Sequence, residues 1–181
     1  MAIKTMAMSS GNEQYNKGWH TLEISNAKYG TWENGDNSKT YLDIWFKDYP
    51  ENFNMRIFEA HEKATQEEFK ISNIFKRANA GIISVLKDPT GKRPVIQYDD
   101  EASGLVGKSI NCYFYKEQGK DGKTYARAFE DIAPVVQKGE HLSYTEEQVS
   151  GIKTSVENRV QKIQDKSKNG TSNVTDDDIP F

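Results

Sequence analysis

The sequence predicts a mainly β domain that also carries helices, and three observations lead to this prediction. Between residues 18 and 58, apolar and polar residues alternate in three runs, which is the period of half-buried strands. The period then changes to that of an amphipathic helix, and two more alternating runs follow. The expected order is therefore three strands, a helix and two strands, with a second amphipathic helix after residue 140.

The first three strands are separated by turn signals. Asn34-Gly35 is a strong hairpin signal between the first and second strands, and "YPEN" (49–52) separates the second from the third. The second strand, "TYLDIWF" (40–46), alternates most clearly. The apolar parity of the three strands is expected to fill the interior, and it comprises Leu22, Ile24, Leu42, Ile44, Phe46, Met55 and Ile57.

The helix and the last two strands follow from spacing and breakers. Thr65 and Glu68 have the spacing of a capping box, which predicts a helix over about 66–80, with an end near 86 as the alternative. "KDPTGKRP" (87–94) is expected to be a loop. Strands are predicted in "KSINCYFYKE" (108–117) and "TYARAFEDIAPVV" (124–136).

This order is that of an OB-fold, a five-stranded Greek-key barrel, with the helix between strands 3 and 4. The predicted organisation is a flexible arm (1–17), the barrel (18–140), an amphipathic helix (141–166) and a disordered tail (167–181). The apolar stripe of the late helix either packs on its own barrel or pairs with another subunit. Its short length favours the first, because a strong coiled coil needs more heptads.

The outward parity of the strands carries more aromatic rings than a small core needs. If Leu42 and Ile44 fill the interior, then Tyr41 and Trp45 point outward. Rings stack on unpaired bases at roughly 1–3 kcal/mol per base, while Lys and Arg track the phosphates. Rings that cover a protein surface are the alternative interpretation. The residues predicted to contact single-stranded DNA are Tyr29, Trp32, Lys39, Tyr41, Trp45, Arg56, Phe58, Lys92, Arg93, Tyr113, Tyr115, Lys116, Lys123, Tyr125 and Arg127.

The sequence finishes on "DDDIPF", three aspartates followed by an apolar tip. An acidic solubilising tail would explain the aspartates but not the tip. This segment resembles the acidic C-terminal tip of bacterial single-stranded DNA-binding proteins (SSBs). The resemblance implies that the terminal ring and carboxylate enter a basic, hydrophobic pocket on replication and repair proteins. The residues assigned to this docking role are Asp176, Asp177, Asp178, Ile179, Pro180 and Phe181.

The body, over about residues 18–136, more closely resembles bacteriophage-encoded SSBs, because of its helix between strands 3 and 4 and its late amphipathic helix. This resemblance implies a protein of DNA replication, recombination and repair that coats single-stranded DNA without sequence specificity, in the cytoplasm of a bacterial host. It does not imply the bacterial tetramer, so a homo-oligomer stays open. The alternative function is an OB-fold adaptor that binds proteins and has no DNA affinity.

Composition and spacing argue against other functional classes. The net charge of −3 equals the charge of Asp176–Asp178, so the remainder is formally neutral. The three histidines are far apart and Cys112 has inward parity, so we expect no metal, no cofactor and no catalytic set. The adjacent carboxylates at 99–101 are expected to be solvated surface. No apolar stretch reaches the roughly 18 residues of a membrane span, and the single cysteine fits a reducing cytoplasm.

The tail generates a first prediction. An acidic segment tethered near a cationic groove should compete with DNA, so deletion of residues 176–181 should tighten oligonucleotide binding at low salt and abolish partner recruitment. Titration of the full-length and truncated chains with oligo(dT) at low and high salt measures the first effect. Equal affinities of the two chains at low salt would contradict the competition.

Overall fold

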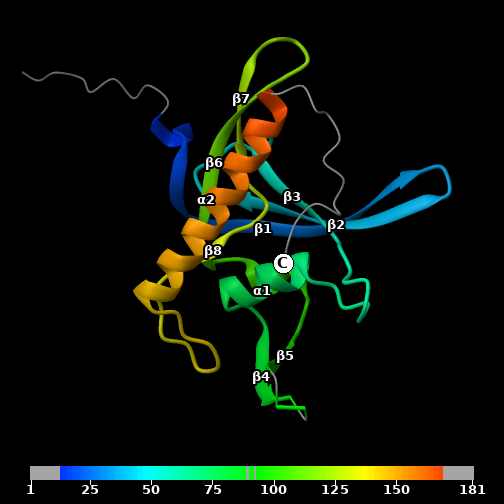
Figure 1. The fold of residues 1–181 in the computed structure, drawn as a ribbon, viewed down its shortest axis with the longest axis vertical. Helices are drawn as coiled ribbons and strands as arrows, with labels where there is room; N and C mark the ends of the chain where they lie inside the picture. Colours follow the sequence, from blue (N-terminus) through cyan, green and yellow to red (C-terminus); the bar gives the residue numbers. More distant parts are fainter. Residues whose placement is uncertain (1–12, 89, 92, 169–181) are drawn as a thin grey trace, which may run out of the picture.

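The computed structural model describes residues 13–88, 90–91 and 93–168 and has a mainly β architecture with two α-helices (Figure 1). The strands form one antiparallel sheet in the order β3-β2-β1-β6-β7, with β8 paired to β6, and a separate β4–β5 hairpin. The elements are η1 (Glu13–Tyr15), β1 (Gly18–Asn34), β2 (Asn37–Phe46), β3 (Asn54–Phe58), α1 (Lys70–Ala78), β4 (Ile82–Lys87), β5 (Pro94–Tyr98), η2 (Ala102–Leu105), β6 (Ser109–Gln118), β7 (Thr124–Ala128), β8 (Ala133–Pro134) and α2 (Glu146–Lys168).

Strand β1 is shared by the two halves of the sheet. Its residues 18–23 pair with β6, and its residues 24–34 pair with β2. A β-bulge lies at the junction, because Ile24 and Asn26 of β1 oppose the adjacent residues Phe46 and Trp45 of β2. The extra residue is Ser25, and it lets one long strand turn the corner between the two halves.

The interior is built from the inward parity of the strands, as the alternation predicts. The expected core residues of the first three strands are all buried, and Ile110, Cys112 and Phe114 of β6 join them. Helix α1 closes this core with Ile71, Ile74, Phe75 and Ala78. The prediction that Cys112 is a small buried apolar residue is confirmed, since its side chain is fully buried and burial raises the pKa of its thiol.

The boundaries predicted for the first helix are wrong at both ends. Helix α1 begins at Lys70, and the Glu68 carboxylate caps it by accepting hydrogen bonds from the backbone N–H groups of Ile71 and Ser72, both at 2.8 Å. It ends at Ala78, and the C-cap Asn79 has a left-handed backbone (φ 52°). The alternative extension to residue 86 is wrong, because residues 82–87 form β4, where β-branched residues favour a strand once the helix is broken. The predicted loop connects β4 to β5, a strand that the sequence did not predict.

Helix α2 begins with a capping box, in which Thr145 and Gln148 each satisfy the other's backbone N–H. The Thr145 N–H donates to Gln148 Oε1 at 2.9 Å, and the Gln148 N–H donates to Thr145 Oγ1 at 3.3 Å. Val149, Val156 and Val160 are buried, and α2 lies against β6 and β8 of its own chain, as Figure 1 shows. Neither of the helices among the described residues is both long and apolar enough to cross a membrane.

Part of the segment predicted as a flexible arm is packed on the residues that follow β2. Tyr15 of η1 contacts Tyr49 and Phe53 edge-on, with ring centroids 5.6 and 5.2 Å apart. The Tyr49 hydroxyl donates a 2.9 Å hydrogen bond to the Gln14 carbonyl. The arm prediction therefore fails for residues 13–17, and residues 1–12 lie outside the described part of the chain.

A partly buried ionic cluster joins α1 and α2. The Asp131 carboxylate, which precedes β8, pairs with Arg77 of α1 and with Arg159 of α2. Arg77 also donates a hydrogen bond to the Ile132 carbonyl. Burial lowers the pKa of the Arg77 guanidinium, and Asp131 opposes that shift. One carboxylate therefore holds two cations from two helices.

This cluster generates a stability prediction. Asp131→Asn removes the charge that compensates the Arg77 and Arg159 guanidinium groups, both partly buried, so it should lower the free energy of unfolding by about 2 kcal/mol. Urea denaturation measures the loss. The matched control is Glu23→Gln, which breaks the exposed 3.6 Å pair with Lys47 and should cost less than about 0.5 kcal/mol. Equal effects of the two substitutions would contradict the structural role of Asp131.

Candidate nucleic-acid interface

Aromatic rings and cations gather on the outward face of residues 26–34 of β1 together with β2 and β3. Directly opposed residues of antiparallel strands share a face, so the register fixes the composition of this surface. Lys28, Asp43 and Arg56 form one cross-strand row, and Gly30, Tyr41 and Phe58 form the next. We call this surface the aromatic face, and its side chains are Lys28, Trp32, Lys39, Tyr41, Asp43, Trp45, Asn54, Arg56 and Phe58.

Tyr41 lies at the centre of the aromatic face. Its ring packs directly on Gly30, where a Cβ atom would lie only 2.3 Å from Tyr41 Cζ. The Arg56 guanidinium lies over the ring, 3.9 Å from the centroid. Phe58 meets Tyr41 edge-on at 5.7 Å and Trp32 edge-on at 6.4 Å. Three rings and one guanidinium therefore form a continuous group.

Asp43 fixes the position of Arg56. The guanidinium donates two hydrogen bonds to this carboxylate, from Nε at 2.8 Å and from Nη2 at 2.7 Å. These hydrogen bonds raise the pKa of Arg56, so the side chain stays cationic. The Asp43 side chain is nearly buried, whereas that of Arg56 is 43% exposed, so the cation keeps an open side.

The charge of the aromatic face is positive although the whole chain is negative. Lys28, Lys39 and Arg56 supply three cations, and Asp43 supplies the one carboxylate. At the other end of the face, Trp45 is half-buried and its indole N–H donates to the Glu51 carbonyl at 3.0 Å. Flat rings are thus interleaved with cations along β2.

Two predicted rings of β6, Tyr113 and Tyr115, lie on a different part of the sheet from Tyr41. Tyr113 meets Trp19 edge-on at 5.3 Å, and the Trp19 indole N–H donates to Glu157 of α2 at 2.5 Å. Lys153 of α2 lies 5.3 Å from the Trp19 ring centroid. Tyr115 is half-buried and meets Phe129 edge-on. The helix therefore covers Tyr113, and the structure does not bring it together with Tyr41.

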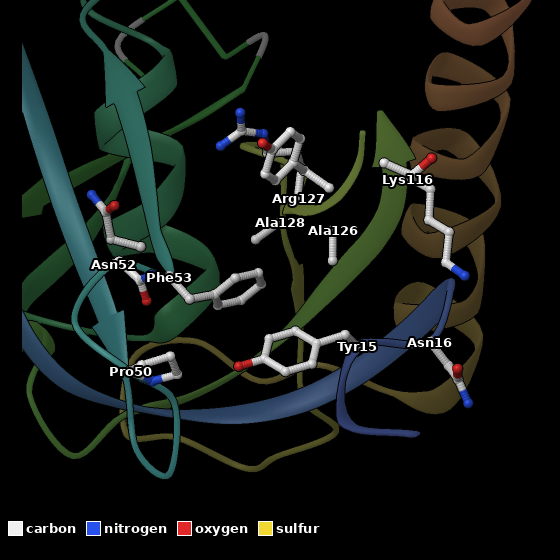
Figure 2. Close-up of a pocket in the computed structure, with 12 residues that line it drawn as sticks. Tyr15, Asn16, Pro50, Asn52, Phe53, Lys116, Ala126, Arg127 and Ala128 are labelled. Carbon is white, nitrogen blue, oxygen red and sulfur yellow. The ribbon is translucent and has the colours of Figure 1, made fainter. Parts of the chain in front are cut away.

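A cavity of about 550 Å³ lies between the start of β3 and the end of β7 (Figure 2). Tyr15 and Phe53, whose rings contact one another edge-on, line this cavity together with Ala126 and Ala128. Three of the predicted residues, Lys116, Tyr125 and Arg127, also line it. Asn54 belongs both to this cavity and to the aromatic face, so the two adjoin at β3.

Other predicted residues lie apart from these groups. Tyr29 is on the core side of β1, opposite Leu42, where burial and then Asp100 raise the pKa of its hydroxyl. Arg93 is at the tip of the β4–β5 hairpin, and exposed Lys123 is in the β6–β7 hairpin. These hairpins lie at opposite ends of the molecule's long axis in Figure 1. Lys92 and the docking residues 176–181 lie outside the described residues.

Sequence reasoning missed several residues of this surface. Lys28 and Asn54 belong to it by register, and Tyr15 and Phe53 line the adjoining cavity. The alternation of "FNMRIFEA" could have placed Asn54 beside Arg56. Nothing in the alternation of β1 could have placed Lys28, because the bulge at Ser25 reverses the parity of the strand.

Neither similarity to known proteins nor a metal-binding cluster indicates the function of this chain. No protein-family model matches the sequence, and no curated protein matches it. Among the residues that the structure describes, no group of three or more His, Cys, Asp or Glu side chains is arranged to hold a metal ion. The function must therefore be argued from the aromatic face and the cavity beside it.

The close contact of Gly30 with Tyr41 generates a prediction. Gly30→Ala should push the Tyr41 ring away from Arg56 and lower the free energy of unfolding by about 1 kcal/mol, the scale of one ring–cation contact. The NMR shift of the Arg56 Nε–H should also lose the ring-current contribution of Tyr41. The control is Gly104→Ala, where the added methyl meets no atom within 4 Å. An unchanged Arg56 resonance in Gly30→Ala would contradict the arrangement.

Proposed function

We propose that this chain is a single-stranded DNA-binding protein that coats unpaired strands without sequence specificity in replication, recombination and repair. The aromatic face is the observation that carries the proposal. Unpaired strands present bases and phosphates together, and this face presents rings at stacking positions with cations beside them. Stacking on rings accepts any base, so such a surface needs no sequence readout.

The strand order supports an OB-type barrel as the framework. A long connection leads from β3 to β6, and β6 then lies beside β1, the first strand. The resulting order β6-β1-β2-β3 is the arrangement of a Greek key. In this proposal β7 is the fifth barrel strand, and the barrel is open between β3 and β7, where the cavity lies. OB-folds bind oligonucleotides over their second and third strands and the adjoining hairpins. The aromatic face occupies that position.

The DNA path that we propose starts at the β1–β2 hairpin and crosses the aromatic face toward the cavity. Trp32 and Lys39 are opposed on this hairpin. Tyr41, Arg56 and Phe58 follow on β2 and β3, and Lys116 and Arg127 line the cavity beyond. Tyr113 is left out of the path because α2 covers it. The last six residues would recruit replication and repair proteins, a role that rests on their resemblance to the SSB tip.

The decisive experiment is titration of the full chain with oligo(dT), followed by tryptophan fluorescence at several salt concentrations. Trp32 and Trp45 lie on the proposed path, so saturable quenching is expected, with an affinity that falls as salt rises. Intact oligonucleotides after binding would agree with a protein that is not a nuclease. Absence of quenching at low salt would overturn DNA binding and favour the protein-binding adaptor.

Trp45 generates a specific prediction. Trp45→Ala should weaken oligo(dT) binding by roughly 1–3 kcal/mol, which corresponds to one stacked base. Filter binding or anisotropy of a labelled oligonucleotide measures the change without using tryptophan fluorescence. The control is Phe69→Ala, which removes an exposed ring just before α1 that is not on the proposed path. Wild-type affinity of Trp45→Ala would show that the strand does not cross this part of β2.

A further inference from the structure

The β4–β5 hairpin is a two-stranded sheet that extends away from the barrel (Figure 1). Its base is anchored, since the Asp99 N–H donates to the Gly81 carbonyl at 2.8 Å and the Tyr98 ring lies 5.4 Å from that of Phe75 in α1. Beyond this base the two strands pair with each other. An isolated two-stranded hairpin is only marginally stable in water, so an extended one calls for a partner.

The hairpin exposes aliphatic side chains on both strands. Ile83 is 60% exposed, Leu86 is 47% exposed and Val85 is 37% exposed, all on β4. Val95 of β5 is 46% exposed. Leu86 and Val95 are directly opposed and share one face of the hairpin, whereas Val85 lies on the other face. A single exposed aliphatic residue needs no explanation, but four within two short paired strands leave apolar surface exposed to water on both faces of the hairpin.

The two edges of the hairpin differ in their protection. Natural sheets protect exposed edges with proline or charge. Strand β5 begins with Pro94, whereas residues 82–86 of β4, "IISVL", contain neither proline nor a charged residue. Within the described part of the chain, β5 is the only strand that pairs with β4. The outer edge of β4 therefore presents backbone donors and acceptors to another strand.

Charge along the hairpin indicates what that strand is. The tip carries the exposed cations Lys87 and Arg93, and its half-buried carboxylate, Asp88, accepts hydrogen bonds from Thr90. The base continues into the exposed carboxylates of Asp99, Asp100 and Glu101. A second β4 running antiparallel across a two-fold axis would place each tip beside the base of the other copy. The cations of one hairpin would then lie near the carboxylates of the next, at both ends of the joint.

We propose that a second copy of this chain docks on the outer edge of β4, so that the two hairpins form one four-stranded antiparallel sheet. The joint is isologous, with the same edge used by both copies. It adds backbone hydrogen bonds, covers part of the exposed aliphatic surface and pairs opposite charges at its two ends. It needs no DNA, so it stands or falls independently of the proposed function.

Sedimentation equilibrium of the full chain without DNA tests the proposal. The expected result is a concentration-dependent species of twice the 20.6 kDa of one chain. Val85→Lys places like charges close together across the two-fold axis and should raise the dissociation constant of the dimer by about tenfold. The matched control is Val136→Lys, which makes the same substitution at a 55% exposed valine outside the hairpin and should leave the dimer intact. Thermal melting followed by circular dichroism checks that both variants fold.

A charge exchange tests the antiparallel arrangement separately. Lys87→Glu and Asp100→Lys should each weaken the dimer, and the double variant should recover most of the wild-type affinity. A monomeric wild-type chain, or a dimer that survives Val85→Lys, would overturn the proposal. Failure of the double variant to recover dimerisation would overturn the pairing of tip with base.

Discussion

An extra residue in β1, Ser25, determines which side chains reach the aromatic face. Before the bulge, even-numbered residues such as Leu22 and Ile24 point into the core; after it, the odd-numbered Ala27 and Tyr29 do so. Without the extra residue, Lys28 and Trp32 would point inward beside Leu42, and the outward face of β2 would lose its neighbours on β1. The same bulge lies where β1 passes from β6 to β2, so the corner of the sheet and the composition of its surface depend on one insertion.

The alternation of the sequence was sufficient to predict the strands that have one buried face. The inward parity of β2, β3 and β6 follows directly from the sequence because the residues between the apolar core positions are polar or are the outward-facing rings Trp45 and Tyr113. The β4–β5 hairpin could not be found in this way. Its exposed aliphatic residues leave no clean two-residue period, and "IISVL" continues the apolar spacing of α1. Local helix breakers, Asn79 and Gly81, decide the outcome.

Parity alone could not separate the two aromatic groups either. Tyr41 and Tyr113 both point outward from the sheet, but α2 covers only the half that β6 contributes. That covering depends on a contact distant in sequence, between Trp19 near the start of β1 and Glu157 in α2. The sequence identifies outward-facing rings, whereas the tertiary structure decides which of them solvent or a ligand can reach.

The packing of Tyr41 against Gly30 couples two positions on neighbouring strands. A residue larger than glycine at 30 requires either a smaller side chain at 41 or a ring that leaves Arg56, so neither position can vary independently. Homologues that retain this surface should therefore change the two positions together, and redesign of its binding properties should treat them as one unit. Arg56 and Asp43 extend the same dependence to β3, so a single glycine limits the variation that three strands can tolerate.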